Sequence, residues 1–256
     1  MSDVLLEVDG VRVRFGGIVA LDGVSFTMPK GKIVGLIGPN GAGKTTLFNC
    51  LSRLYVPNEG DIRFEGRTIL DRPPHHMAPI GIGRTFQNLA LFGTMTVLEN
   101  VMVGGHSATG SDFMSNALRL PWRSKEERAL RNRCGELVEY LGLGKVAHSP
   151  VAGLPFGTQK RVELARALAS APKLLLMDEP AGGLNHDELD ELGHVIQQIR
   201  DDRGITVLLV EHHMGLVMSI SDKVVAIDFG KKISEGTPQE VQQDPEVIRA
   251  YLGTGN

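Results

Sequence analysis

Apolar and polar residues alternate over Leu5–Phe15, which is the pattern of a strand with one face buried. After a glycine pair the alternation resumes over Val19–Met28 and predicts a second strand. Lys32–Ile37, Lys173–Glu179 and Ile205–Val210 are instead short, mostly apolar runs, typical of strands buried on both faces. Further strands are predicted at Asp61–Glu65, Lys223–Asp228 and Lys231–Glu235.

Between these strands, apolar residues recur every three or four positions, which predicts amphipathic helices. The helices are predicted at Leu47–Leu51, Ser124–Leu143, Thr158–Ala171, His186–Arg203 and Pro238–Leu252, with another that begins at Thr96 as its cap. Arg67–Pro79 is polar and rich in proline, so we expect a surface connection there.

Strands that alternate with helices favour an α/β fold with a mostly parallel sheet. The two early strands add an N-terminal antiparallel β subdomain to this prediction. Residues 94–157 have a more helical character and predict an inserted helical lobe, which leaves residues 1–93 and 158–256 for the core. We therefore expect residues 1–256 to form a single domain, and this length is enough to bury a full core.

The composition changes this picture little, since 42% of the residues are hydrophobic and 22% are charged, as in ordinary globular proteins. A formal net charge of −3 provides no general attraction to nucleic acid or anionic lipid. Cys50 and Cys134 stand apart, without metal-type spacing, and suit a reducing compartment. We expect no signal peptide at Met1, and the longest apolar runs are far too short to cross a bilayer.

The strongest chemical signal is the glycine-rich turn Gly38–Gly43, which lies between the predicted strand Lys32–Ile37 and the predicted helix Leu47–Leu51. Its glycines allow several backbone N–H groups to point into one concavity, and the following helix adds its own free N–H groups. This is the phosphate loop of a P-loop NTPase core, with Lys44 for the β- and γ-phosphates and Thr45 for Mg²⁺. A turn that binds nothing is the alternative, but glycines, lysine, threonine and flanking elements all agree. The predicted nucleotide-binding residues are Gly38, Asn40, Gly41, Gly43, Lys44, Thr45 and Thr46.

Two carboxylates end the apolar strand that begins at Lys173. Ligand sites of open α/β sheets lie beyond the carboxyl ends of the strands. Since neighbours on a strand point to opposite faces, we expect separate roles for them. Asp178 is predicted to hold Mg²⁺, and Glu179 to polarise the water that attacks the γ-phosphate. The alternative for Glu179 is a surface acid or a helix cap.

Gln87 and His212 are weaker signals, because a polar residue at a strand end is usually only solvated. Both are expected at strand exits on the side of the phosphate loop, which favours roles in sensing the γ-phosphate and its water. Phe15 ends the first strand, where an aromatic ring could stack on a base or could belong to the core. The sequence leaves these two alternatives for Phe15 open.

A second glycine, Gly157, stands at the start of a basic and then apolar helix in Leu154–Leu168. A helix N-terminus with glycine access is a further potential anion site. One chain does not need two γ-phosphate sites for one nucleotide. A dimer with shared sites would account for both.

Taken in order, these motifs resemble those of the ATPase subunit of ABC transporters, and the resemblance covers nearly the whole chain. The motifs are GPNGAGKTT as phosphate loop, Gln87 as Q-loop, LPFGTQKRVELARAL as signature, LLLMDEP as the acidic strand, AGGLN as D-loop, and His212 as switch histidine. The resemblance implies ATP and Mg²⁺, with the metal held by Thr45, Gln87 and Asp178. It also implies a head-to-tail pair of ATPase subunits, with each ATP between one phosphate loop and the partner's signature at Gly157. Phe15 falls at the family's adenine-stacking position.

A finer resemblance is to the ATPases of branched-chain (hydrophobic) amino acid importers, carried by FGGIVALDGVSF, GRTFQNLALFGTMTVLENVMVG, LLVEHHMGLVM and VQQDPEVIRAYLG. Urea importers and lipopolysaccharide exporters share parts of these segments. The resemblance implies a peripheral protein on the cytoplasmic face of the inner membrane, bound to transmembrane permease subunits through residues 94–150 and the Q-loop. A periplasmic or extracellular solute-binding protein would be an indirect partner, and nucleic acid would not be one.

Four residues depart from the family pattern. Pro155 stands where the signature usually has serine, Thr158 replaces glutamine, Asn185 replaces the D-loop aspartate, and His213 follows the switch histidine where aspartate is common. Pro155 removes a hydroxyl that would reach the partner's γ-phosphate. We therefore expect an intact phosphate loop, a weakened signature and an asymmetric heterodimer.

The alternative function class is an ABC-type ATPase that acts on DNA or ribosomes. Such proteins usually carry two ATPase units or a long coiled coil, and this chain has one unit and no basic surplus. A third class, a module that binds ATP without hydrolysing it, is disfavoured because Glu179 and His212 are both present.

Overall fold

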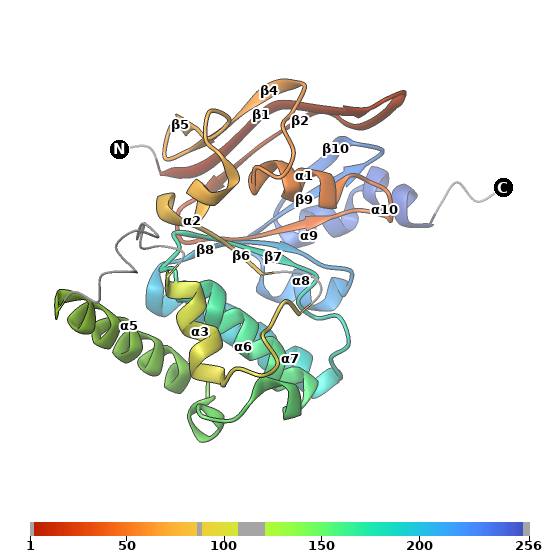
Figure 1. The fold of residues 1–256 in the computed structure, drawn as a ribbon. Coiled ribbons are helices and arrows are strands. Elements are labelled where there is room, and N and C mark those ends of the chain that lie inside the picture. The colour runs from red at the N-terminus through yellow and green to blue at the C-terminus, as the bar shows by residue number, and fades with distance from the viewer. Residues whose placement is uncertain (1–2, 86–88, 107–120, 253–256) are drawn as a thin grey trace.

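The computed structural model describes residues 3–85, 89–106 and 121–252, and within these residues two sheets are stacked (Figure 1). The smaller sheet is antiparallel, with the order β2-β1-β4-β5. Its strands are β1 (Val4–Phe15), β2 (Ile18–Pro29), β4 (Glu59–Phe64) and β5 (Arg67–Thr68). The predicted N-terminal antiparallel subdomain is therefore confirmed.

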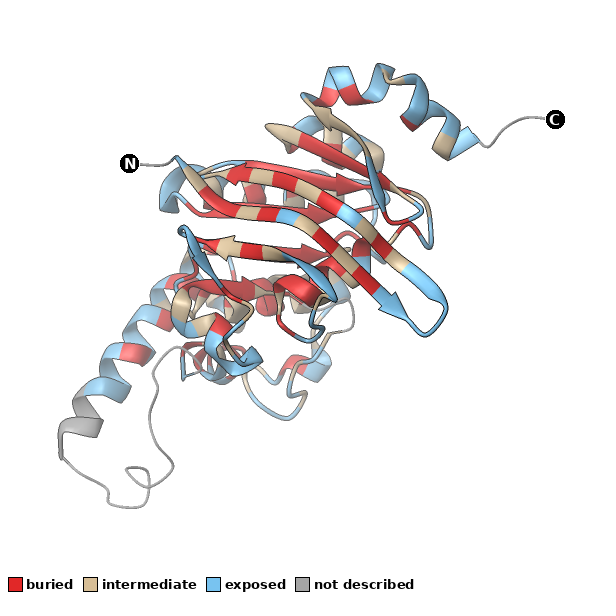
Figure 2. Cartoon of the chain, turned by 90° about the horizontal axis from the view of Figure 1, so that it is seen from above, coloured by how far each residue is buried: buried red, intermediate tan, exposed pale blue. Residues whose placement is uncertain are grey.

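The larger sheet has the order β10-β9-β3-β8-β7-β6 and is parallel except for the β9–β10 hairpin. Its strands are β3 (Ile33–Ile37), β6 (Ile82–Arg84), β7 (Leu174–Asp178), β8 (Thr206–Val210), β9 (Lys223–Asp228) and β10 (Lys231–Gly236). Every residue of β3, β7 and β8 is buried, as their continuous apolar runs predict. Figure 2 shows buried residues along the strands of both sheets.

Helices cover the larger sheet on both faces. They are α1 (Lys44–Leu51), α2 (Met77–Ile80), α3 (Val97–His106), α5 (Pro121–Tyr140), α6 (Phe156–Leu168), α7 (His186–Arg203), α8 (Met214–Ile220), α9 (Pro238–Gln243) and α10 (Pro245–Leu252). Short 3₁₀ turns lie at Pro74–His76, Gly144–Val146 and Val151–Gly153.

The core has two parts because successive strand side chains point to opposite faces. Val34 and Leu36 pack with α1 between the two sheets. Ile33 and Ile37 of the same strand pack on the other face, in the part of the core that α3, α5, α6 and α7 complete. Within that layer α3 lies against α5 and α6 (Figure 1). The exact boundaries of a helical lobe at 94 and 157 stay a prediction.

Two predicted elements are wrong in detail. Arg67–Pro79 is more than a connection, since it contains β5, a 3₁₀ turn and α2, elements too short to show periodicity. Pro238–Leu252 is two helices, because proline disfavours a helical residue before it and Asp244 adopts an extended ψ of 122°. Within the described ranges, no helix is both long and apolar enough to cross a membrane.

Candidate nucleotide site

The glycine-rich loop joins β3 to α1 and has a backbone that only glycine fits. Gly43 has φ 104°, and a Cβ atom there would lie 2.6 Å from the carbonyl oxygen of Ala20. Gly38 has φ 155°, and its Cβ would lie 2.1 Å from the carbonyl oxygen of Ile227. The loop therefore curls tightly against β2 and β9, which is the shape that aims backbone N–H groups into one concavity.

Lys44 lies at the centre of this loop. Its Nζ donates hydrogen bonds to the carbonyl oxygens of Gly38 at 2.6 Å and Pro39 at 2.9 Å, and the residue is buried. Burial lowers the pKa of Lys44, whereas the nearby charges of Glu179 and Asp178 oppose that shift. The ammonium group is thus fixed beside the loop and close to both predicted carboxylates.

A cleft of about 260 Å³ opens over the loop, and it contains most of the predicted nucleotide-site residues. It is lined by Ile18, Val19, Ala20, Asn40, Gly41, Ala42, Gly43, Lys44, Thr45, Thr46, Glu179 and His212. The fold therefore brings the phosphate loop together with Glu179 from the end of β7 and His212 from the end of β8. Gln87 lies outside the described residues.

Asp178 is the last residue of β7 and is buried beside the cleft. Its Oδ2 accepts a hydrogen bond from Nη2 of Arg84 at 3.0 Å, and Arg84 also donates to Asn49 and Ser52 around α1. Burial raises the pKa of Asp178, and the Arg84 charge counteracts that rise. Arg84 was given no role by the sequence, because its partner Asp178 lies 94 residues away.

Glu179 does not continue the strand, so the expectation of opposite-facing strand neighbours is wrong. It has φ 48°, in the left-handed region that non-glycine residues rarely adopt. Its Oε1 lies 2.5 Å from Nε2 of His212, although both side chains remain partly exposed to the cleft. Two of the three residues with predicted catalytic roles, Glu179 and His212, are therefore in direct contact.

Phe15 is 47% exposed, so it does not belong to the core. Its ring meets Tyr55 edge to face, with the centroids 5.2 Å apart. This exposure at the end of β1 keeps adenine stacking by Phe15 as a prediction.

Gly157 is not among the residues that line the cleft over the phosphate loop. It lies in the first turn of α6, where a Cβ would meet Glu188 of α7 at 2.4 Å. Pro155 is the N-cap residue of α6, and no side chain of the described residues caps this helix start. Gln159 instead bonds back to the carbonyl oxygen of Leu154 at 2.8 Å.

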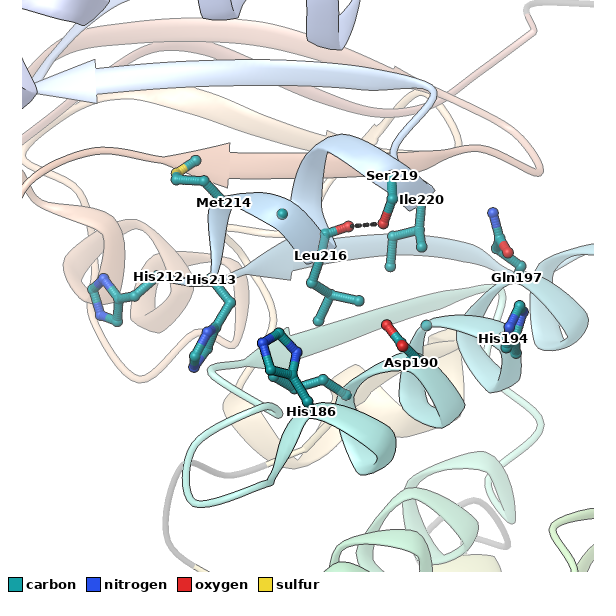
Figure 3. A pocket seen from close by; sticks show the side chains of 13 residues that line it. His186, Asp190, His194, Gln197, His212, His213, Met214, Leu216, Ser219 and Ile220 are labelled. Atoms are coloured by element: carbon teal, nitrogen blue, oxygen red, sulfur yellow. Dashed lines mark hydrogen bonds between the residues drawn. The ribbon is translucent and has the colours of Figure 1, made fainter.

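A second, larger cavity of about 710 Å³ lies between α7 and α8 (Figure 3). His212 lines both cavities. The following His213 lines only the larger one of the two, and its side chain points away from His212, toward the side of His186. Across the described part of the chain, no group of three or more His, Cys, Asp or Glu side chains could hold a metal ion.

The sequence also missed a contact from the C-terminal helix α10. Burial raises the pKa of the Tyr251 phenol, and a hydrogen bond with the backbone of Gly38 partly opposes this rise. The last described helix thus reaches the phosphate loop. The signal was absent from the sequence because the two residues are distant along the chain.

Comparison with known families gives two matches. The family described as "ABC transporter" matches residues 21–182, and the family described as "Branched-chain amino acid ATP-binding cassette transporter" matches residues 231–255. The high-affinity branched-chain amino acid transport ATP-binding protein BraF of Pseudomonas aeruginosa is 42% identical, over 99% of each chain. The corresponding protein LivG of Escherichia coli is 40% identical, again over 99% of each chain.

Solved structures agree with these matches. An ATP-binding cassette of an ABC transporter in its ADP conformation has a TM-score of 0.86 and 32% identity, and covers 98% of this chain and 100% of its own. A dimeric ATP-binding cassette in a post-hydrolysis state with ADP and phosphate has a TM-score of 0.76 and 26% identity, with 91% and 99% coverage.

Proposed function

The chain belongs to the ABC transporter family, and from this premise we propose that it hydrolyses ATP to power the uptake of branched-chain or other hydrophobic amino acids, or of a similar small solute. The amino acid substrate is supported by the names of the full-length relatives and by the matching C-terminal segment. The observation that carries the chemistry is the contact of Glu179 with His212 at the cleft over the phosphate loop.

In this proposal the backbone of the phosphate loop and Lys44 bind the β- and γ-phosphates of ATP. Glu179 orients and polarises the attacking water, and His212 holds the Glu179 carboxylate in place and contacts the γ-phosphate. The developing negative charge is stabilised by Lys44, which already lies within the field of both carboxylates.

The residues present fit Mg²⁺. Thr45 lines the cleft, and the charge of the buried Asp178 carboxylate opposes the lowering of the Lys44 pKa. Mg²⁺ prefers oxygen ligands and usually takes only one or two from the protein, with phosphates and waters as the others. We propose Thr45, Asp178 and Gln87 as its ligands; when bound, Mg²⁺ neutralises charge on the β- and γ-phosphates.

Replacement of one oxygen of Glu179 tests the hydrolytic role. Glu179→Gln should keep ATP affinity within about twofold and lower turnover by 10²-fold or more, which is the range for loss of a general base. Glu65→Gln is the matched control, because Glu65 also has a left-handed φ of 50° but lies at the β4–β5 hairpin and binds Lys173. Turnover by Glu179→Gln at the level of this control would refute the role.

We further propose that the chain pairs with a second ABC ATPase subunit, and that Gly157 is presented to the partner's ATP. The helical segment 94–150, with Gln87, would contact the permease subunits. Phe92, Met95 and Val103 are apolar and more than a third exposed around α3, as such a contact would require. The protein would then be peripheral, on the cytoplasmic face of the inner membrane, with a solute-binding protein as indirect partner.

Purification of the tagged chain from native membranes in mild detergent tests these partners. Two membrane proteins and a second ATPase should accompany it. Recovery with ribosomes or DNA instead would refute the transport role while leaving the ATPase chemistry in place.

A further inference from the structure

Glu211 is a buried carboxylate between β8 and His212, and it holds two loops at once. Its Oε1 accepts a hydrogen bond from the backbone N–H of Ala181 at 2.6 Å. Its Oε2 accepts from the N–H groups of His212 at 2.9 Å and His213 at 3.3 Å. The residue is only 2% exposed, and its bond from Ala181 is buried, whereas those from the two histidines are partly buried.

The need for this carboxylate follows from the strand ladder beside it. The β7–β8 pairing ends at Asp178, and the last bond beside it runs from the N–H of Glu179 to the carbonyl oxygen of Val210 at 2.9 Å. The next residue is Pro180, which has no N–H, so the ladder stops there. Glu211 supplies the next acceptor from its side chain, and thereby satisfies the N–H of the fully buried Ala181.

The two backbones that Glu211 ties together carry the two side chains that meet in the cleft. Glu179 lies two residues before Ala181, and its Oε1 is 2.5 Å from Nε2 of His212. The left-handed φ of Glu179 persists only where the surroundings fix the backbone on both sides. One side is fixed by Val210, and the other by Glu211 through Ala181.

We propose that Glu211 is a positioning residue that sets the register between Glu179 and His212. It also couples the loop Ala181–Asn185 to His212, so that a displacement of this loop is transmitted to the Glu179–His212 contact. This inference rests on the proposed function, in which Glu179 and His212 act on the γ-phosphate. Glu211 itself touches neither ATP nor water in the reaction.

The test compares Glu211→Gln with Asp222→Asn in the full-length chain. The glutamine amide turns a donor toward one set of N–H groups, so that only one loop stays tied. We expect kcat to fall at least tenfold, with the KM for ATP within twofold. Asp222 also bridges two elements, Ile33 and Arg200, but at the amino end of β3. Asp222→Asn should lower the Tm by a similar amount and leave kcat within twofold.

A second variant covers the case in which Glu211→Gln fails to fold. Glu211→Asp keeps the charge but is one methylene shorter, so it cannot span both loops. It should show the same loss of kcat at unchanged KM. Equal kcat losses in the Glu211 and Asp222 variants would overturn the positioning role, because both would then report stability alone.

A double-mutant cycle separates this inference from the proposed function. If Glu211 acts by setting the contact between Glu179 and His212, Glu211→Gln should cause a much smaller loss of kcat in a His212→Ala background than in the wild type. Additive losses would overturn the coupling while keeping His212 in its role. Wild-type turnover by His212→Ala alone would overturn both the role of His212 and the positioning proposal.

Discussion

Two glycine-containing helix starts, those of α1 and α6, differ in how much of their surroundings the chain itself provides. Neither start has a side-chain cap from the described residues, whereas α7 has a complete capping box. At α1, the carbonyl oxygens of Ala20 and Ile227 leave no room for a Cβ on the loop glycines, and Lys44 donates a hydrogen bond to the loop backbone. At α6, Phe156 stands 45% exposed in the first turn. The phosphate-loop half of the proposed shared nucleotide site is thus finished within the chain, and the proposed α6 half faces outward.

The largest effect is expected from an added methyl group in the finished half. Gly43→Ala places a Cβ 2.6 Å from the Ala20 carbonyl oxygen and forces a left-handed φ on alanine. The loop must then open, and we expect ATP affinity to fall by about 100-fold or more, since its contacts are lost together. Isothermal titration with a non-hydrolysable ATP analogue measures this affinity.

Gly153→Ala is the control, in the turn just before α6, where a Cβ would meet nothing within 4 Å. Its affinity for the analogue should match that of the wild type. Equal losses in both variants would show that the strict geometry of the phosphate loop does not distinguish the two regions.

The second effect concerns the buried pair that connects β6 to β7 beside the phosphate-loop helix. Arg84→Met removes the partner of Asp178, which then stays buried without its countercharge. Loss of one partner of a buried ion pair costs about 3 kcal/mol of unfolding free energy. Urea unfolding at pH 7.5 should show this loss. Arg63→Met, which breaks the more exposed pairs with Glu7 and Asp61, should lose less than about 1 kcal/mol.

The pH dependence of this loss has a definite sign. Burial already raises the pKa of Asp178 in the folded chain, and loss of Arg84 raises it further. The folded variant therefore retains a proton that the unfolded chain has released, so its unfolding free energy falls as pH rises from about 4 toward the raised pKa. The loss of unfolding free energy in Arg84→Met, relative to the wild type, should be smaller at pH 5 than at pH 7.5. An equal deficit at both pH values would contradict the assignment of Asp178 as the affected group.

The sequence predicted the long and strongly patterned elements well. His186–Arg203 is observed at its predicted bounds, because its amphipathic pattern and the Gly204 that closes it agree. The prediction missed the helix break before Pro245. A proline disfavours a helical residue before it, but the amphipathic pattern continues across this position. The elements within Arg67–Pro79 were missed because they are only two to four residues long, and are fixed by contacts such as Arg63 with Thr68 rather than by periodicity.

The candidate site was predictable where one short stretch of sequence sets both the backbone conformation and the chemical groups of the site. Gly38–Thr46 is such a stretch, since the residues that make the turn are also those predicted to contact the phosphates. Arg84 and Glu211 were not predictable, because their roles depend on partners 94 and 30 residues away. Nor did the sequence show that Glu179 leaves the strand with a positive φ, since only the packed loop around it enforces that conformation.

The smallest expected effect lies in the outward-facing half and is the one that bears most directly on pairing. Pro155→Ser restores the hydroxyl that the family signature usually carries, at an N-cap with φ −54° and ψ 150° that serine can adopt. A serine cap stabilises by about 1 kcal/mol, but loss of proline frees the unfolded chain by a comparable amount, so stability should hardly change. Turnover with its partner ATPase should rise about threefold, because the hydroxyl adds a donor to the partner's γ-phosphate.

Pro73→Ser, at the N-cap of the 3₁₀ turn Pro74–His76, makes the same exchange at a remote position and should leave turnover unchanged. If Pro155→Ser also leaves turnover unchanged, the weakened signature is not what makes the two halves of the site unequal.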